Sequence, residues 1–187
     1  MNESGDFESL IVRTVECLNE TVIEYCIVGA IAASYYGSVR STEDLDVIIN
    51  LSNTDVKQIK HLVSCLKAKE IDLIESDMVQ GLKEKSHITA FDTRTYFYRI
   101  DFKGIYSLLD KETMNTKVQV TILDDLNIWL TPPELQIIAK LLPGMSSEKD
   151  ILDIKNILLN YKENLDVKLL ENFAKKFNVE KELNRLL

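Results

Sequence analysis

The sequence changes its pattern at the segment Thr-Pro-Pro-Glu that begins at Thr131. Before this segment, short apolar runs typical of strands alternate with amphipathic helical patterns, whereas the residues after it have almost entirely helical periodicity. Thr131 is a suitable helix N-cap, Pro132 suits the first turn, and Glu134 would complete a capping box. The sequence therefore predicts an α/β (α+β) part in residues 1–130 and a C-terminal helical subdomain in residues 131–187.

Apolar spacing places individual elements within these two parts. The expected helices of the first part cover 7–19, 30–36, 56–67 and 76–83, and the expected strands cover 25–28, 45–50, 87–91, 96–103, 117–123 and 127–130. The expected helices of the tail cover 134–142, 147–160, 167–177 and 180–187, with a break at Pro143-Gly144. The strand at 45–50 is apolar enough to lie in the centre of a sheet.

Composition restricts the class of protein. Of 187 residues, 45% are hydrophobic and 28% are charged, which is typical of a folded globular chain and excludes wholesale disorder. The net charge of −8 argues against a surface that binds nucleic acid over its whole area, although it is compatible with a local basic cleft. The longest uncharged stretch, 25–39, is too short to cross a bilayer, and the amino terminus lacks a secretory signal. We therefore expect a cytoplasmic protein without membrane contact.

The three cysteines are Cys17, Cys26 and Cys65. They form no Cys-x-x-Cys pair, their spacing is wide and their number is odd, so they do not have the pattern of a disulfide framework or a zinc site. We expect three buried, reduced thiols.

Two carboxylates, Asp44 and Asp46, lie two residues apart at the start of an apolar strand. Side chains at this spacing project to the same face of a sheet, where they repel each other unless a cation lies between them. Hard oxygen ligands of this kind suit Mg²⁺. The alternative is an ordinary strand end with two solvated acids.

A third acid and a glycine turn add to this pair. Asp101 lies on a different predicted strand and is a candidate metal ligand or general base; the alternative is an ion-pair ladder with Arg99 and Lys103 on the same face. Gly29 follows a strand and opens a helix, a position where backbone N–H groups can approach a phosphate. The alternative for Gly29 is an ordinary strand-to-helix turn.

Aromatic residues cluster in two places, Tyr35-Tyr36 and the run that contains Phe91, Tyr96, Phe97 and Tyr98. Such rings can stack a nucleobase. Their helical and strand spacing favours the core instead, and only Tyr36 and Phe97 are expected close to the cleft.

These residues resemble the DNA polymerase β-type nucleotidyltransferase superfamily. The resemblance rests on Gly29-Ala30, a short helix, the pattern Arg40-x-Thr42-x-Asp44-Leu45-Asp46 and the later Asp101. In the tail, Leu130-Thr-Pro-Pro-Glu-Leu135, Lys140-Leu141 and Lys149-Asp150-x-x-Asp153 are similar to the AbiEii/MenT-like branch of nucleotidyltransferase toxins. The resemblance implies a mixed β-sheet with flanking helices, followed by a C-terminal helical bundle.

The resemblance also implies roles for single residues. Asp44, Asp46 and Asp101 would hold the catalytic metal, Mg²⁺ or Mn²⁺, and Asp101 would help to activate the acceptor hydroxyl. The triphosphate of the NTP substrate would be bound by the backbone of Gly29 and Ala30, with Arg40 and Thr42 beside it. Lys140 would reach a phosphate from the tail, and Asp150 or Asp153 would support that lysine or the nucleotide.

The implied activity is transfer of a nucleotide from an NTP to a hydroxyl of RNA, with tRNA foremost, or of a protein. A toxin role would add a cognate antitoxin protein as partner. Two alternatives stay open: a catalytically silent member that binds nucleotides or other proteins, and an antitoxin-like member of the same fold.

Overall fold

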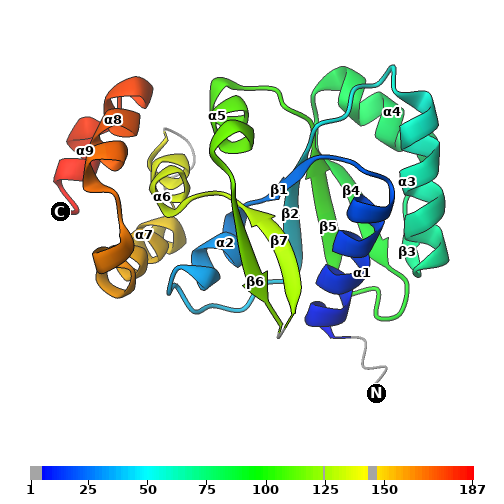
Figure 1. Ribbon diagram of the computed structural model, residues 1–187, viewed down its shortest axis with the longest axis horizontal. Helices are drawn as coiled ribbons and strands as arrows, with labels where there is room; N and C mark the ends of the chain where they lie inside the picture. Colours follow the sequence, from blue (N-terminus) through cyan, green and yellow to red (C-terminus); the bar gives the residue numbers. More distant parts are fainter. Residues whose placement is uncertain (1–5, 124, 143–146) are drawn as a thin grey trace.

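The computed structural model describes residues 6–123, 125–142 and 147–187. Its strands form one mixed sheet in the order β3-β4-β5-β2-β1-β7-β6 (Figure 1). They are β1 (Tyr25–Ile27), β2 (Asp44–Ile49), β3 (Ile71–Asp72), β4 (Ile88–Asp92), β5 (Arg99–Lys103), β6 (Val118–Ile122) and β7 (Leu126–Leu130). Strand β2 lies centrally, as its apolar pattern predicts, with β5 parallel and β1 antiparallel to it. The predicted break at Pro143-Gly144 lies outside the described residues.

Helices cover the sheet and extend beyond one end of it. They are α1 (Phe7–Glu20), α2 (Gly29–Tyr35), α3 (Val56–Ala68), α4 (Glu75–Glu84), α5 (Leu108–Thr116), α6 (Pro133–Leu141), α7 (Glu148–Asn160), α8 (Val167–Phe177) and α9 (Glu180–Asn184), with a short 3-10 helix at Lys162–Asn164. Helix α3 contacts both α1 and α4, whereas α6–α9 gather at the opposite end of the sheet (Figure 1). The predicted mixed sheet with flanking and C-terminal helices is therefore confirmed.

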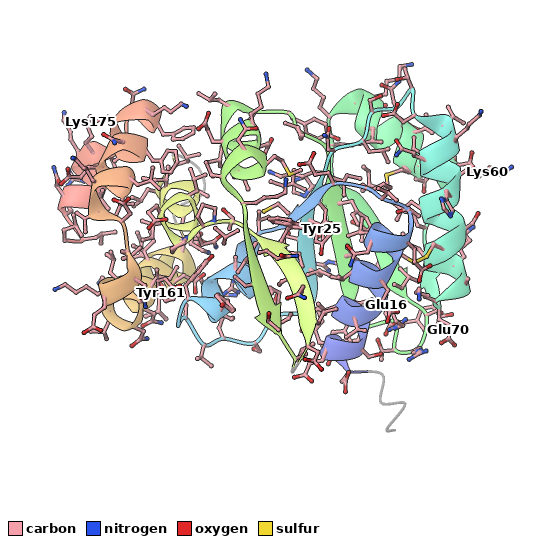
Figure 2. The ribbon with its side chains drawn as sticks, in the orientation of Figure 1. Glu16, Tyr25, Lys60, Glu70, Tyr161 and Lys175 are labelled. Atoms are coloured by element: carbon pink, nitrogen blue, oxygen red, sulfur yellow. A yellow bond between two sulfur atoms is a disulfide. The ribbon has the colours of Figure 1, made fainter. Side chains whose placement is uncertain are left out.

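Of two apolar clusters among the described residues, the larger runs through the molecule. Leu45 of β2 and Ile100 and Phe102 of β5 are fully buried on the sheet face opposite the carboxylates. The same cluster continues through Leu130 into α6 and α7, so it crosses the predicted division at 130/131, which stays a prediction. Figure 2 shows Tyr25 inside this core and Lys60 and Lys175 on the outside. No helix in the described parts of the chain is long and apolar enough to span a membrane.

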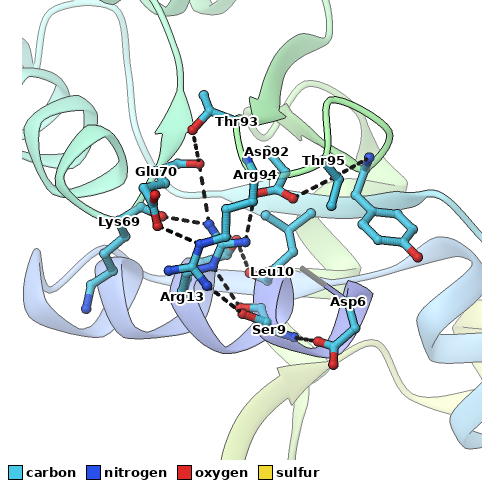
Figure 3. Close-up of polar contacts among 12 residues, drawn as sticks. Asp6, Ser9, Leu10, Arg13, Lys69, Glu70, Asp92, Thr93, Arg94 and Thr95 are labelled. Atoms are coloured by element: carbon cyan, nitrogen blue, oxygen red, sulfur yellow. Dashed lines mark hydrogen bonds and ion pairs between the residues drawn. The ribbon is translucent and has the colours of Figure 1, made fainter. Parts of the chain in front are cut away.

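The prediction that a strand begins at residue 96 is wrong, because β5 begins only at Arg99. Tyr96 has a positive φ of 54°, and its N–H donates to the carbonyl of Asp92 at 2.9 Å. The Thr95 hydroxyl donates to the Asp92 carboxylate at 2.8 Å (Figure 3). The segment between β4 and β5 is therefore a turn that is held by hydrogen bonds to Asp92.

Asp92 is fixed by a buried arginine of α1. Arg13 Nη2 donates to Asp92 Oδ1 at 2.8 Å, and Arg13 Nη1 donates to the carbonyl of Lys69 at 2.7 Å (Figure 3). Burial alone would raise the pKa of Asp92, but hydrogen bonds from Arg13 and Thr95 outweigh it and hold the pKa below its usual value. This network ties α1 to the ends of β3 and β4.

Two helix starts differ from the sequence analysis. The predicted capping box at Thr131 is wrong: Pro132 is the N-cap of α6, and the Thr131 N–H instead donates to Ile27 and prolongs the pairing of β7 with β1. Glu134 accepts a hydrogen bond from the Asp166 N–H at 2.8 Å. Helix α5 was missed, although Ser107 and Asp110 form a capping box that the sequence contains.

The expectation of three reduced thiols is wrong, because Cys17 of α1 and Cys65 of α3 form a disulfide with a Cα–Cα distance of 5.6 Å. These residues are 48 positions apart, so sequence spacing alone gave no sign that the packing of α1 against α3 would bring them together. Cys26 is a free, buried thiol, and its burial raises its pKa to about 12.

Reduction of this disulfide should destabilise the protein. Closing a loop of 48 residues stabilises a fold by roughly 4 kcal/mol in the chain-entropy account. We expect a reductant to lower the melting temperature by roughly 10 °C, and the Cys17→Ala/Cys65→Ala variant to melt at this lower temperature with or without reductant. If a thiol reagent detects three free thiols in the unreduced, unfolded wild-type protein, the Cys17–Cys65 pairing is contradicted.

Candidate active site

The sheet register brings the three candidate carboxylates together. Asp46 of β2 lies directly beside Asp101 of β5, and Asp44 lies beside Arg99. Alternation along both strands places these side chains on one face, away from the core side occupied by Leu45. The shared face predicted for Asp44 and Asp46 is thus present, and Asp101 is next to it.

This arrangement is electrostatically costly for Asp46. Burial, followed by the nearby charges of Asp101 and Asp44, raises the pKa of Asp46 to about 6. Asp44 Oδ1 is also buried and has no hydrogen-bond partner among the residues that the structure describes. A divalent cation would relieve both features, because it would offset the repulsion and coordinate the open oxygen.

Neighbouring side chains partly offset the negative charge of the three carboxylates. Arg99 Nη2 donates to Asp44 Oδ2 at 2.8 Å, and Arg99 Nε lies 3.7 Å from Asp101 Oδ2. The Thr89 hydroxyl donates to Asp101 Oδ1 at 2.6 Å. The ion-pair ladder considered as an alternative for Asp101 is therefore present on the Arg99 side, whereas Lys103 pairs with Asp110 of α5 at 2.7 Å.

The described residues hold no group of three or more His, Cys, Asp or Glu side chains already arranged around a metal position. The oxygen donors of Asp44, Asp46 and Asp101 are nevertheless of the type that Mg²⁺ prefers. Arg99 holds Asp44 Oδ2, so its release would be required only for Asp44 to bind a metal through both of its oxygens.

Gly29 packs its backbone against Asp46. Its φ is +68°, and a Cβ at this position would lie 2.0 Å from Asp46 Oδ2. The Val28 N–H donates to the Asp46 carbonyl at 3.0 Å, and Gln136 Nε2 of α6 donates to the Gly29 carbonyl at 2.7 Å. The glycine is therefore required both by its conformation and by the closeness of the carboxylate.

Gly29→Ala should displace Asp46 and destabilise the protein. The positive φ costs roughly 1–2 kcal/mol in an L-residue, and relief of the contact with Asp46 adds to this. We expect a melting temperature at least roughly 5 °C lower and loss of any nucleotide-dependent stabilisation. Ala30→Gly is the matched control, because it changes the neighbouring helical residue by less than about 1 kcal/mol; an equal loss in both variants would contradict a special role of Gly29.

Lys140 is held by two acids of α7. Its Nζ lies 2.8 Å from Asp150 Oδ1 and 2.6 Å from Asp153 Oδ2, and the side chain is 8% exposed. Burial alone would raise the pKa of Asp150, but hydrogen bonds from Lys140 and Ser147 outweigh it and lower the pKa. Asp150 and Asp153 thus both lie next to this lysine, and the role that the resemblance implies for them stays a prediction.

Of the other expected nucleotide-binding residues, Arg40 contacts this cluster, whereas Thr42 and Ala30 have other surroundings. Arg40 Nε lies 3.3 Å from Asp153 Oδ2, and the Ser38 hydroxyl donates to Asp153 Oδ1 at 2.6 Å. The Asp44 N–H donates to the Thr42 hydroxyl at 3.3 Å, and this hydroxyl lies 3.2 Å from the Asp44 carbonyl oxygen. Thr42 therefore positions the start of β2. Ala30 is buried in the first turn of α2.

A cleft of about 310 Å³ lies between Asp46 and Asp101 on the sheet and Lys140 on α6, and Asp44, Ala30, Arg40, Thr42 and Asp153 are not among the residues that line it. Of the predicted residues it is lined by Gly29, Asp46, Asp101, Lys140 and Asp150. Gln136 and His87 also line the cleft, and neither is among the site residues that the sequence predicts. Tyr36 does not reach the cleft, because it is buried and its hydroxyl donates to the Thr131 carbonyl at 2.8 Å.

Comparisons with known proteins identify the fold. No family model and no curated protein sequence matches the chain. An antigenic nucleotidyltransferase-like protein from Paracoccidioides brasiliensis superposes with a TM-score of 0.57 and 17% identity, covering 98% of this chain and 93% of the other. ANT(2")-Ia in complex with adenylyl-2"-tobramycin gives 0.56 and 12% identity, covering 91% and 95%.

The lincosamide antibiotic adenylyltransferase LnuA, lincomycin-bound, superposes with a TM-score of 0.50 and 12% identity, covering 81% of this chain and 96% of the other. The chain is thus similar in structure to several nucleotidyltransferases over most of its length, and it has the nucleotidyltransferase fold. The AbiEii/MenT-like branch stays a prediction from the sequence.

Proposed function

We propose that this protein is an Mg²⁺-dependent nucleotidyltransferase that moves a nucleotide from an NTP to a hydroxyl acceptor. One observation carries this proposal: Asp46 and Asp101 lie side by side over the Gly29 backbone, in a cleft that Lys140 also lines. Transfer of this kind depends mainly on positioning and on neutralisation of phosphate charge, which such a cleft can supply.

Asp44, Asp46 and Asp101 would hold the metal, with Mn²⁺ as a substitute for Mg²⁺. When bound, the metal would make the acceptor hydroxyl more acidic and would neutralise charge on the transferring phosphate. The raised pKa of Asp46 and the open Asp44 Oδ1 support this assignment, because both indicate a site that favours a cation.

The chain's own residues would have distinct roles. Asp101, oriented by Thr89, would accept the proton of the acceptor hydroxyl. The hydroxyl oxygen would bond to the α-phosphorus, and the bond from the α-phosphorus to the oxygen that bridges it to the β-phosphorus would break. Pyrophosphate would leave, and Lys140 would stabilise its charge. The backbone of Gly29 and Ala30 would face the triphosphate, while Arg40 and Thr42 support the site from the loop before β2.

A second function is favoured by the Arg99–Asp44 ion pair at 2.8 Å. A guanidinium that stays on Asp44 would offset part of the negative charge that a metal would otherwise neutralise, as expected in a protein that binds nucleotides without transferring them. The two functions therefore differ in whether Arg99 is displaced when a metal and an NTP bind.

The sequence resemblance also bears on the acceptor and on the biological role. The sequence resemblance favours RNA, with tRNA foremost, or a protein, and it favours a toxin with a cognate antitoxin partner. The structural neighbours named above include enzymes that act on antibiotics, so a small hydroxylated molecule is a third arm of the test.

The experiment is to incubate the purified full chain with each α-labelled NTP, Mg²⁺ and either total RNA, protein extract or hydroxylated antibiotics. We expect label on one acceptor class together with pyrophosphate release, and neither with EDTA. Thermal stabilisation by Mg²⁺ and NTP without label on any acceptor would instead support the silent nucleotide-binding module. Absence of both would contradict the proposal.

A further inference from the structure

One hydroxyl of the chain itself is hydrogen-bonded to the proposed general base. Thr89 Oγ1 donates to Asp101 Oδ1 at 2.6 Å, within the range of about 2.6–3.2 Å that a base requires to take a proton. In the described parts of the chain, no other serine or threonine hydroxyl donates to the side chain of Asp44, Asp46 or Asp101. Thr89 therefore lies where the hydroxyl of an acceptor would have to lie.

The sheet holds this hydroxyl in place. Thr89 of β4 lies directly beside Asp101 of β5, which in turn lies beside Asp46 of β2. Ala90 is fully buried, whereas Thr89 and Phe91 on either side of it are half-buried and exposed, so the Thr89 side chain projects to the carboxylate face. A hydroxyl fixed on a paired strand loses little freedom when it reacts, which favours it over a hydroxyl in solution.

Thr89 borders the cleft on the side of Asp101. It lines a surface hollow together with His87, and His87 also lines the cleft. The hollow and the cleft thus meet at His87. Thr89 does not line the cleft itself, so an α-phosphorus has to lie at the Asp101 end of the cleft for Thr89 Oγ1 to reach it.

We propose that the protein transfers a nucleotide to its own Thr89. Asp101 accepts the proton of Thr89 Oγ1, and this oxygen bonds to the α-phosphorus of the NTP. The bond from the α-phosphorus to the oxygen that bridges it to the β-phosphorus breaks, and pyrophosphate leaves. The product is a phosphodiester between Thr89 and the nucleoside. The proposal rests on the proposed nucleotidyltransferase function and adds a modification site to it.

The modification closes the site to other acceptors. The modified Thr89 has no hydroxyl proton to donate to Asp101. The attached nucleotide also occupies the space beside Asp101 that an external hydroxyl requires. The reaction therefore stops after one nucleotide per chain.

The test is to incubate the purified full chain with each α-labelled NTP and Mg²⁺, without an added acceptor, and to locate the label by mass spectrometry of peptides. We expect up to one label per chain, on the peptide that contains Thr89, and none with EDTA. The labelled fraction should grow at a rate that does not depend on protein concentration, because the site and the acceptor belong to one molecule.

Four variants test the chemistry. Thr89→Ser retains a hydroxyl and should be labelled, whereas Thr89→Val retains the shape of the side chain and should not. Asp101→Asn removes the base and should slow the labelling by roughly a hundredfold or more. Thr121→Val is the matched control, because Thr121 is an exposed threonine of β6 whose hydroxyl donates to Asn127 Oδ1 at 2.8 Å. Its labelling should equal that of wild type, and circular dichroism checks that each variant is folded.

External acceptors are added to parallel samples, so that two failures can be told apart. Label on an external acceptor with none on the chain would overturn self-modification and leave the proposed function standing. Label on the chain at another residue, or a labelled fraction that rises with protein concentration, would likewise overturn transfer to the chain's own Thr89. Absence of label from the chain and from every acceptor would overturn both proposals.

Discussion

Asp46→Asn is expected to reduce nucleotide transfer by about a thousandfold or more, which corresponds to ~4 kcal/mol of transition-state stabilisation. The substitution retains the size of the side chain but removes the charge that a metal would require between Asp44 and Asp101. Label transfer and the thermal shift caused by Mg²⁺ and NTP should both disappear, while the circular dichroism spectrum stays that of the folded protein.

The same variant should be more stable than wild type in the absence of ligand. The pKa of Asp46 is raised to about 6 in the fold, above the ~3.9 of an unfolded chain. The folded state therefore binds more protons between these values, so its free energy of unfolding falls as the pH rises from about 4 to 6. At pH 7, Asn should recover roughly 1–3 kcal/mol and flatten this pH dependence.

The control for both effects is Asp77→Asn, which neutralises an exposed carboxylate on α4. It should change neither transfer nor the pH dependence of stability. Full transfer activity in Asp46→Asn would remove the carboxylate from the mechanism, and an unchanged pH profile would contradict its raised pKa.

Lys140→Met is expected to weaken NTP binding by more than about tenfold, or ~1.4 kcal/mol, and also to destabilise the ligand-free protein. From the sequence we expect a small effect on ligand-free stability, on the premise that the lysine has no internal partner. The structure contradicts that premise, because Asp150 and Asp153 both contact Lys140. Removal of one member of a buried ion cluster costs about 3 kcal/mol, or roughly 6–12 °C in melting temperature.

Lys149→Met is the matched control, because Lys149 is an exposed lysine on the first turn of α7. It should leave both stability and NTP binding close to wild type. If Lys140→Met melts early but binds NTP normally at a temperature where it is folded, Lys140 is a structural ion-pair residue and the tail is a packing unit.

The sequence predicted the elements whose pattern is local. Strand β2 with its two carboxylates and helix α8 follow from apolar spacing alone. Helix α5 was missed although its Ser107–Asp110 box is visible in the sequence, because its polar run lacks a strong apolar stripe. The exposure of Phe91 could not be predicted, since alternation gives two faces to a strand but does not say which one is covered.

Long-range contacts could not be predicted from local sequence patterns either. The Cys17–Cys65 disulfide, the Arg99–Asp44 ion pair and the Gln136–Gly29 hydrogen bond each join residues far apart in the chain. The register of β2 against β5 decides that Asp101 meets Asp46, and nothing in either strand alone fixes that register.

The most direct test of the proposed metal-dependent active site is a crystal structure with Mn²⁺ and a non-hydrolysable NTP analogue bound. Anomalous scattering would locate the metal. We expect an anomalous peak between Asp46 and Asp101, the triphosphate between Gly29 and Lys140, and Arg99 displaced from Asp44. A nucleotide bound elsewhere, or a triphosphate in the cleft with Arg99 still on Asp44 and no peak beside Asp46, would contradict it.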